Sequence, residues 1–299
     1  MDVVDVVHHT DPACSWCWGM EPVLRRLQVT YGPQVRVVRK MGGIIPSLEW
    51  MVGKAYITRR AQQIARYWLQ VSKKVGMPIN PTMWRRNPPE STWPANIAYK
   101  AAQFQDLAVA DRYLRRVREA ALLEGQNVGE YPTLFELAGE MGLSVGAMEG
   151  AVESGQAKEA FFNDVREGHR HSVAGFPTVF IRFGDQEEKL EGWHPYPEYE
   201  AAVERLTGGR LERWSIPDPL GFLQQHERAT TQEVALVLQQ RHESVRRRLA
   251  SLADEGLVQR RPLPRTTVWV AGGTAPPTNG KRPRQSTKEP KTKAGPRAR

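Results

Sequence analysis

The chain has 299 residues, of which 40% are hydrophobic and 25% charged, so it can bury a sizeable core, as one large domain with a smaller partner. No run approaches the ~18 apolar residues that a membrane-spanning helix requires, and Met1 leads into Asp2-Val3-Val4-Asp5 instead of a basic region followed by an apolar signal segment. We therefore expect a soluble, cytoplasmic protein, and neither a membrane protein nor a secreted one.

The net charge of +9 is unevenly distributed along the chain. Residues 1–209 carry 24 Lys and Arg against 25 Asp and Glu, whereas residues 210–299 carry 18 against 8. The excess positive charge therefore belongs to the C-terminal part, which indicates an acidic partner for that part alone.

The first predicted elements form a βαβ unit. Val3–His9 is a short β-branched run, typical of a strand buried on both faces. A helix follows, in which Val23, Leu24, Leu27 and Tyr31 recur at helical spacing until Gly32-Pro33 ends the pattern. Gln34–Met41 then reads as a second strand.

Helices dominate the middle of the chain, from about residue 45 to residue 173. The clearest segments are Thr58–Val75, Ala95–Phe104, Val109–Leu123, Thr133–Met141 and Gly155–His171, with Ser144 as the cap of a shorter helix. Strands return at Pro177–Phe183 and Glu188–Trp193, and a helix follows at about Pro197–Leu206. The predicted order is βαβ, a helical block, and then ββα.

The C-terminal part begins after a linker, residues 209–218. Helices are expected near Leu220–His226, Thr231–Leu238 and Glu243–Glu255, followed by a hairpin up to residue 272. Residues 273–299 form a basic tail with almost no large apolar side chain, and we expect this tail to be disordered because it cannot offset the entropy cost of folding.

The only two cysteines, Cys14 and Cys17, stand three positions apart at the first strand-to-helix turn. A reducing cytosol does not maintain structural disulfides, so such a pair is typically catalytic, redox-sensing or metal-binding. At the start of the helix, Cys14 would have a lowered pKa and attack as a thiolate. Cys17, on the same helix face, could then resolve the mixed disulfide.

These residues carry a resemblance to a known family. The Cys-x-x-Cys after the first strand, the helical insertion and "GFPT" (Gly175–Thr178) before the ββα half resemble the thioredoxin fold of the DsbA superfamily, and "DPACSWCWG" resembles its cytoplasmic FrnE-like branch. The resemblance covers about residues 1–208 and implies an α/β thioredoxin-like domain with a helical insertion at about 45–173. It also implies that Cys14 is the nucleophile, Cys17 the resolving thiol and Pro177 a cis-proline beside them.

Four further residues are candidates for the same site. A cis Phe176-Pro177 bond would expose backbone groups for strand-like pairing with a substrate chain, although a trans proline could also start the strand. Trp16 is expected to line a groove for apolar substrate segments, and packing explains it nearly as well. His8 could handle protons for the second thiol, or simply be a hydrogen-bonded residue at a strand end.

Zinc is the main chemical alternative to a redox pair. Cys14 and Cys17 supply half of a tetrahedral site, and His169 with His171 could complete it, but His-x-His is not a common spacing in structural zinc sites. We therefore expect no metal and no cofactor beyond a redox-active Cys14–Cys17 disulfide.

The C-terminal part, residues 219–272, resembles a winged helix-turn-helix domain. In such domains the third helix enters the major groove of DNA and the wing contacts its backbone. The basic side chains on those two elements are the candidates for nucleic-acid binding: Arg246, Arg247, Arg248, Arg260 and Arg261. A solvated basic face, or a winged helix that binds protein, is the alternative.

Together these features predict an enzyme, a cytoplasmic thiol-disulfide oxidoreductase that acts on the disulfides of client proteins and carries a module for DNA. Two related families have functions other than thiol-disulfide exchange. The chromene-carboxylate isomerases usually have a serine at the active position, a pattern from which Cys14 departs. Thioredoxin-like adapters that deliver a transcription factor to the ClpXP protease share a "CSWC"-type motif and bind without turnover. A non-enzymatic adapter and a redox-responsive DNA-binding regulator are therefore the alternative functions.

Overall fold

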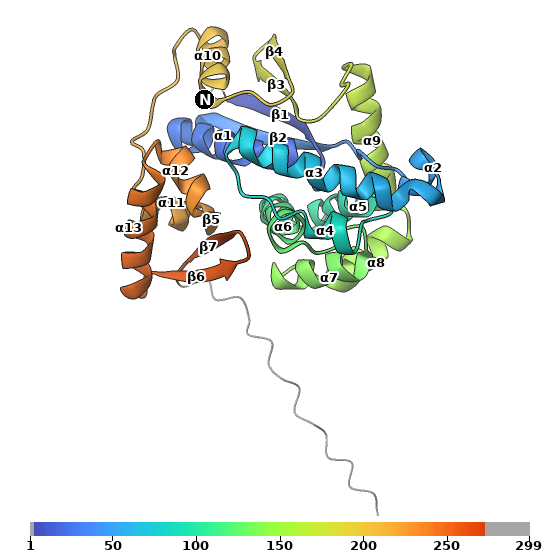
Figure 1. Cartoon of the computed structure of the whole chain (residues 1–299). Coiled ribbons are helices and arrows are strands. Elements are labelled where there is room, and N and C mark those ends of the chain that lie inside the picture. The colour runs from blue at the N-terminus through green and yellow to red at the C-terminus, as the bar shows by residue number, and fades with distance from the viewer. Residues whose placement is uncertain (1–2, 273–299) are drawn as a thin grey trace, which may run out of the picture.

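A computed structural model describes residues 3–272, so the tail predicted at 273–299 lies outside the described residues. The chain folds into an N-terminal unit, residues 3–208, and a C-terminal unit, residues 219–272, each with its own sheet (Figure 1). Within the described part, no helix is both long and apolar enough to cross a membrane.

A four-stranded sheet lies at the centre of the N-terminal unit. Its strands are β1 (Val4–Thr10), β2 (Val35–Met41), β3 (Thr178–Phe183) and β4 (Gln186–Glu191), in the order β2-β1-β3-β4. β1 runs parallel to β2 and antiparallel to β3, and β4 is antiparallel to β3. The predicted strands are all present, each within two residues of its expected ends.

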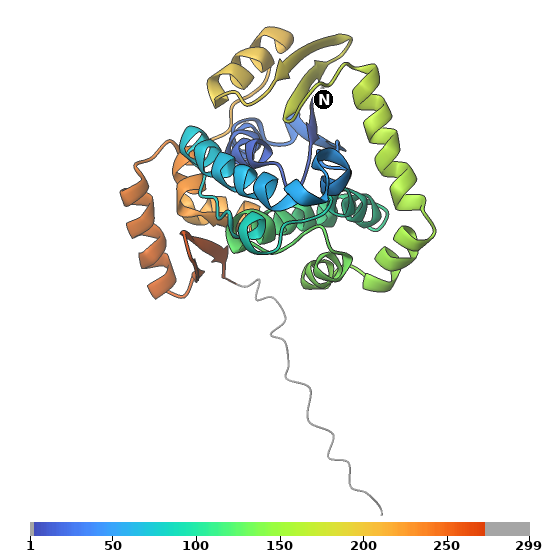
Figure 2. The ribbon, with the colours of Figure 1, turned by 45° about the vertical axis from the view of Figure 1, so that its right-hand side comes forward.

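Helices cover both faces of this sheet. α1 (Ser15–Tyr31) and α10 (Tyr196–Thr207) pack on the face that carries Val4 and Val6 of β1. α9 (Gln156–Arg170) contacts β2 on the opposite side (Figure 2). Because side chains alternate along a strand, His8 shares the α1 face with Val6, whereas His9 faces the other way and contacts Phe180.

The segment between β2 and β3 is helical, as the sequence predicts. Its elements are α2 (Leu48–Val52), η2 (Lys54–Tyr56), α3 (Ile57–Val75), α4 (Thr82–Arg86), α5 (Trp93–Gln103), α6 (Leu107–Glu119), the π-helical turn η3 (Ala120–Glu124), α7 (Tyr131–Glu140), α8 (Val145–Glu153) and α9. Ser144 caps α8, as predicted, by accepting a hydrogen bond from the Ala147 amide at 3.4 Å. The five-residue helices α2 and α4 were not predicted, because they are too short to show helical periodicity.

The C-terminal unit has three helices and a three-stranded sheet. Its elements are α11 (Pro219–His226), β5 (Arg228–Thr230), α12 (Thr231–Leu238), α13 (His242–Asp254), β6 (Val258–Leu263) and β7 (Thr266–Ala271), with strand order β5-β7-β6. The three helices lie within a residue or two of their predicted ends. The three-residue strand β5 was not predicted.

The segment predicted as a linker lies against the N-terminal unit. The Trp214 amide donates a hydrogen bond to the Thr30 carbonyl at 2.7 Å, and the Gln34 side chain bonds to both backbone groups of Glu212, at 2.8 and 3.0 Å. A Cβ at Gly32 would come within 2.7 Å of the Trp214 ring, and the φ of Gly32 is +55°. Glycine at this turn therefore makes room for the tryptophan that holds the segment in place.

Buried ion pairs join the two units. Glu233 of α12 is fully buried and accepts two hydrogen bonds from Arg115 of α6, at 2.8 and 2.7 Å, and its carboxylate lies 3.0 Å from Arg25 of α1. Arg228 of β5 pairs with Glu119 of α6 at 2.5 Å. Carboxylates and arginines of both units thus compensate each other's charge in the interior.

Neutralising Glu233 should therefore be costly. Glu233→Gln keeps the shape of the side chain but leaves two buried guanidinium groups without their shared counter-charge, so we expect a loss of about 3–5 kcal/mol in the free energy of unfolding. Glu243→Gln is the matched control, because Glu243 forms an exposed pair with Arg246 and should cost at most about 1 kcal/mol. Urea denaturation measures both, and equal losses would contradict a structural role for the network.

His226 predicts a pH dependence of stability. Burial, together with the nearby Arg25 and Arg115, lowers the pKa of His226 to about 3. Below about pH 6.5 the unfolded chain therefore binds a proton at this histidine, whereas the folded chain does not bind it until about pH 3. Stability therefore decreases as the pH is lowered through this window, by up to about 1.4 kcal/mol per pH unit. His226→Gln should remove that share of the slope between pH 6.5 and 5, and an unchanged slope would show that His226 is protonated in the folded state.

Candidate functional site

The two cysteines lie at the turn between β1 and α1. Cys14 is the N-cap residue of α1, with extended backbone angles, and its Sγ accepts a hydrogen bond from the Cys17 amide at 3.3 Å. Both cysteines are free thiols. The sequence places the pair here because an apolar strand is followed by Asp11-Pro12, which ends it, and by a helix.

A buried carboxylate, which the sequence analysis did not single out, shapes this turn. Asp11 accepts hydrogen bonds from the amides of Ala13 and Ile44, at 2.8 and 2.9 Å, and from the side chains of Thr92 and Asn96, both at 2.9 Å. Burial raises the pKa of Asp11, and these hydrogen bonds oppose that rise. Asp11 therefore joins the β1–α1 turn to the loop after β2 and to α5. Its only signal in the sequence is an Asp-Pro pair at a strand end.

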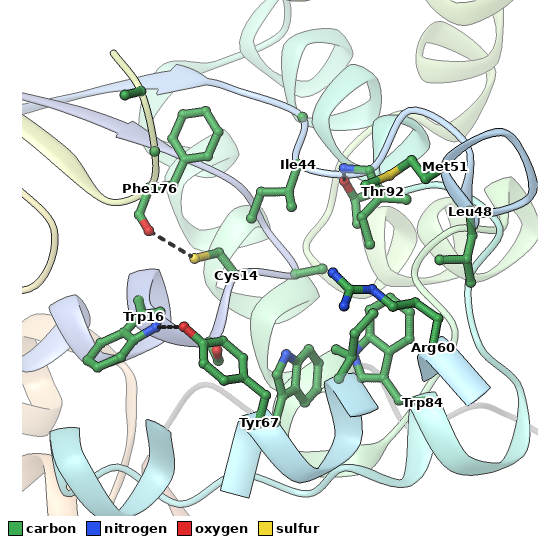
Figure 3. Close-up of a pocket in the computed structure, with 18 residues that line it drawn as sticks. Cys14, Trp16, Ile44, Leu48, Met51, Arg60, Tyr67, Trp84, Thr92 and Phe176 are labelled. Atoms are coloured by element: carbon green, nitrogen blue, oxygen red, sulfur yellow. Dashed lines mark hydrogen bonds between the residues drawn. The ribbon is translucent and has the colours of Figure 1, made fainter. Parts of the chain in front are cut away.

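The Cys14 thiol points toward the loop before β3 (Figure 3). Only 5% of Cys14 is exposed, and its Sγ donates a hydrogen bond to the Phe176 carbonyl at 3.7 Å. The Phe176–Pro177 peptide bond is cis, as predicted. Burial, and then the neighbouring Cys17, raise the pKa of Cys14 well above its usual value. The sequence predicted a lowered pKa for Cys14, and burial of its sulfur acts in the opposite direction.

Cys17 and His8 lie beneath Cys14, in the interior. Burial alone would raise the pKa of Cys17, but Cys14, His8 and the Arg118 charge together lower it well below its usual value. This order is opposite to the one the sequence predicted. Burial lowers the pKa of His8, and its interaction with the Cys17 side chain opposes that change. The thiol with the lower pKa is thus the one that solvent does not reach.

An apolar groove of about 460 Å³ opens beside Cys14. Figure 3 shows that Trp16, Tyr67, Trp84 and Phe176 form its walls, together with aliphatic side chains of the loop after β2, α2 and α3. The Trp16 indole donates a hydrogen bond to the Tyr67 hydroxyl at 2.6 Å. The groove is lined by Ala13, Cys14, Ser15, Trp16, Gly43, Ile44, Ile45, Leu48, Met51, Arg60, Ile64, Tyr67, Trp68, Trp84, Thr92, Ala174, Gly175 and Phe176.

Exposed apolar side chains occur on the two helices that line this groove, α2 and α3. Trp50 is 80% exposed and Met51 43%, both on α2, and Tyr67 of α3 is 48% exposed. Large apolar side chains that remain in water next to a groove are typical of a protein-binding surface. Trp16 lies where the sequence predicted it, whereas α2 and α3 were not predicted to contribute.

The alternative zinc ligands do not meet the cysteines. His169 and His171 are exposed at the end of α9, and the His171 ring contacts Phe180. Between residues 3 and 272, no three His, Cys, Asp or Glu side chains are grouped as metal ligands.

The basic residues predicted to bind DNA lie at two places in the C-terminal unit. Arg246, Arg247 and Arg248 are exposed on α13, where Arg246 pairs with Glu243 and Arg248 lies 3.6 Å from Glu255. Arg260 and Arg261 are exposed on β6. Their binding to nucleic acid stays a prediction.

Comparison with known proteins identifies the family. A family model described as Thioredoxin matches residues 8–201. The chain belongs to this family. The α/β thioredoxin-like fold that the sequence predicted is thereby confirmed, and a solved structure, the cytosolic disulfide reductase DsbM from Pseudomonas aeruginosa, shares it with a TM-score of 0.55 at 21% identity. That similarity covers 68% of this chain and 98% of DsbM.

Curated relatives match more of this thioredoxin-family chain. The ClpXP adapter protein SpxH of Halalkalibacterium halodurans is 27% identical over 270 residues, which cover 89% of this chain and 88% of the relative. The protein of the same name from Shouchella clausii is 29% identical over 273 residues, with the same coverage. These relatives are named as adapters and not as enzymes. The predicted thiol-disulfide oxidoreductase function was therefore wrong, and a Cys-x-x-Cys on a thioredoxin fold did not suffice to assign it.

The chemistry of the pair makes a testable prediction. Because only the thiolate attacks, a Cys14 that is both buried and raised in pKa should react with iodoacetamide at pH 7 at least about tenfold more slowly than the same cysteine in the urea-unfolded chain. Its rate should keep rising above pH 9, as its thiolate fraction does. Mass spectrometry locates the label, and fast reaction at Cys14 with an inflection below about pH 8 would contradict the structure.

Proposed function

We propose that this protein is a cytoplasmic, non-enzymatic adapter that holds a client protein for degradation by ClpXP. The supporting observation is how far the similarity extends. The relatives named as ClpXP adapters match 89% of the chain, which includes most of both units, whereas DsbM matches 68% of it and is itself covered almost completely. The function shared with the adapters would therefore use the C-terminal unit as well.

The geometry of the thiols supports the same proposal. An exchange enzyme needs an accessible thiolate as its attacking group, and here burial encloses both thiols and raises the pKa of the outer one. Binding of a client protein does not require an accessible thiolate. In the proposed adapter the turn around Cys14 forms part of the binding surface, and the hydrogen bonds of Asp11 fix the position of that turn.

The apolar groove is the proposed contact for the client. Its aromatic walls and the exposed Met51 offer apolar area, and Arg60 is the charged side chain among its described lining residues. Aromatic side chains that are partly exposed and partly fixed by packing are typical anchors in protein interfaces.

Reconstitution tests the proposal. Clients are identified as proteins that accumulate when the gene is deleted, and each is then incubated with purified ClpXP and ATP, with and without this protein. We expect degradation to be faster with it, and equally fast with the double variant Cys14→Ala, Cys17→Ala, because no thiol chemistry is required. A client that is degraded at the same rate without the protein, or loss of the effect in the double variant, would contradict the proposal.

A pair of variants tests the groove. Met51→Asp places a charge in the apolar groove and should weaken client binding by about tenfold. Leu107→Asp is the matched control, because Leu107 is 67% exposed at the start of α6 and does not line the groove. Both are measured by biolayer interferometry, and equal effects would exclude the groove as the contact.

A further inference from the structure

The near balance of charge in residues 1–209 hides two segments of opposite charge. Residues 50–89 contain eight Lys and Arg and no Asp or Glu, whereas residues 119–157 contain seven Glu and no Lys or Arg. The basic segment includes η2, α3 and α4, and both α3 and α4 contribute to the wall of the apolar groove. Its charged side chains are Lys54, Arg59, Arg60, Arg66, Lys73, Lys74, Arg85 and Arg86.

These eight basic side chains have no acidic partner in the structure. All eight are exposed, and within residues 3–272 none of them forms an ion pair. The Arg60 guanidinium donates one long hydrogen bond, to the Gln63 side chain at 3.5 Å. Other exposed arginines of this unit, such as Arg36 and Arg166, do pair with a carboxylate. The basic segment therefore carries positive charge that no ion pair of the described residues compensates.

The packing of α3 explains why these charges are unpaired. α3 packs on α1, α2 and α4. α4 has no acidic residue, and α1 has only Glu21, which is buried and bound to Arg118. α2 has only Glu49, which forms no ion pair in the described part of the chain. The helices that carry most of the acidic segment, α7 and α8, pack on α5, α6 and α9 instead.

The helical repeat of α3 arranges its basic side chains in rows. α3 lies on the surface of the N-terminal unit (Figure 1). Arg59, Arg66 and Lys73 are spaced seven residues apart, so they form a row along one side of the helix, with about 10 Å between neighbours. Arg60 and Tyr67 form the next row, and both line the apolar groove. Figure 3 shows the Arg60 side chain extending from α3 toward the middle of the groove. Arg59, Arg60, Arg66 and Lys73 are called here the basic side of α3.

We propose that the apolar groove and the basic side of α3 together bind an acidic, amphipathic segment of the client protein. Apolar side chains of the segment would enter the groove, and its Asp and Glu side chains would lie against the basic side of α3. A carboxylate can accept paired hydrogen bonds from a guanidinium such as that of Arg60. The exposed pairs are individually weak, but several of them favour the encounter of two oppositely charged surfaces.

A nucleic acid would be attracted by the same charges but fits the groove less well. Single-stranded nucleic acids bind by stacking their bases on planar side chains. Much of the groove wall is aliphatic, with Ile44, Leu48 and Ile64 among its residues. Such a wall complements the Leu, Ile or Met side chains of a peptide better than it complements a flat base.

The proposal rests on the adapter function only in naming the partner a client. It adds the chemistry by which the adapter would select that client, because the bound segment must carry both apolar and acidic side chains. A segment that is apolar and basic would be repelled by the basic side of α3.

Peptide binding to the purified full-length protein tests the proposal without a protease. The probe is a fluorescein-labelled peptide of Glu and Leu, whose binding is measured by fluorescence anisotropy. It is compared with a peptide that has Gln in place of every Glu and with one that has Ala in place of every Leu. We expect the peptide of Glu and Leu to bind more tightly than either, with an affinity that falls as NaCl is added, because the charges are exposed.

Charge reversal then locates the binding site. Arg60→Glu should weaken binding of the peptide of Glu and Leu by about tenfold. Arg66→Glu, in the row outside the groove, should weaken it by about threefold. Arg247→Glu is the matched control, because it makes the same charge change at an exposed site on α13, and it should leave the affinity within about twofold. Circular dichroism confirms that all three variants are folded.

Equal binding of the three peptides would overturn the proposal, and so would equal effects of the three variants. A labelled single-stranded DNA that binds more tightly than the peptide of Glu and Leu, and is released by Arg66→Glu, would assign the basic side of α3 to nucleic acid instead. The degradation assay with wild-type protein tests the adapter function separately. A protein that speeds degradation without binding the peptide keeps the adapter function and loses this proposal, and one that binds the peptide without affecting degradation does the reverse.

Discussion

Glu233 is a carboxylate with no access to water, and its charge is compensated by arginines from helices of the other unit. A buried charge without its partners is far more costly than an exposed one, so the position of α12 on α1 and α6 is strongly specified. Arg228 and Glu119 extend the same network toward β5.

The cysteine pair shows how burial changes the chemistry of a familiar motif. A helix N-terminus favours a thiolate, and the Cys14 Sγ does accept a hydrogen bond from the Cys17 amide. Yet desolvation of a nearly buried sulfur opposes ionisation, and the Cys14 thiol donates a hydrogen bond to the Phe176 carbonyl, which favours its protonated form. His8 and Arg118 favour the charge on the deeper sulfur instead. The same fold can therefore carry both thiols and still present a binding surface.

Most of the fold could be predicted from the sequence, because strands such as β1 and helices such as α12 have clear periodicity and caps. The cis bond before Pro177 followed from a family resemblance and not from composition. Other features could not be predicted. Short elements such as α2 lack periodicity, the pKa order of Cys14 and Cys17 depends on burial by distant segments, and the pairing of Arg115 with Glu233 joins residues 118 positions apart. Function was missed for a related reason, since a motif reports which groups are present and not whether they are accessible.

Trp214 affects how the two units are placed relative to each other. It anchors the connecting segment at Thr30, close to Gly32, so the ten residues between the units do not act as a flexible tether. The ion pairs and this anchor hold the two units together at two separate places. A protein seated in the apolar groove and another seated against the C-terminal unit would meet at a fixed distance and orientation, without a search through the many geometries that a loose tether allows.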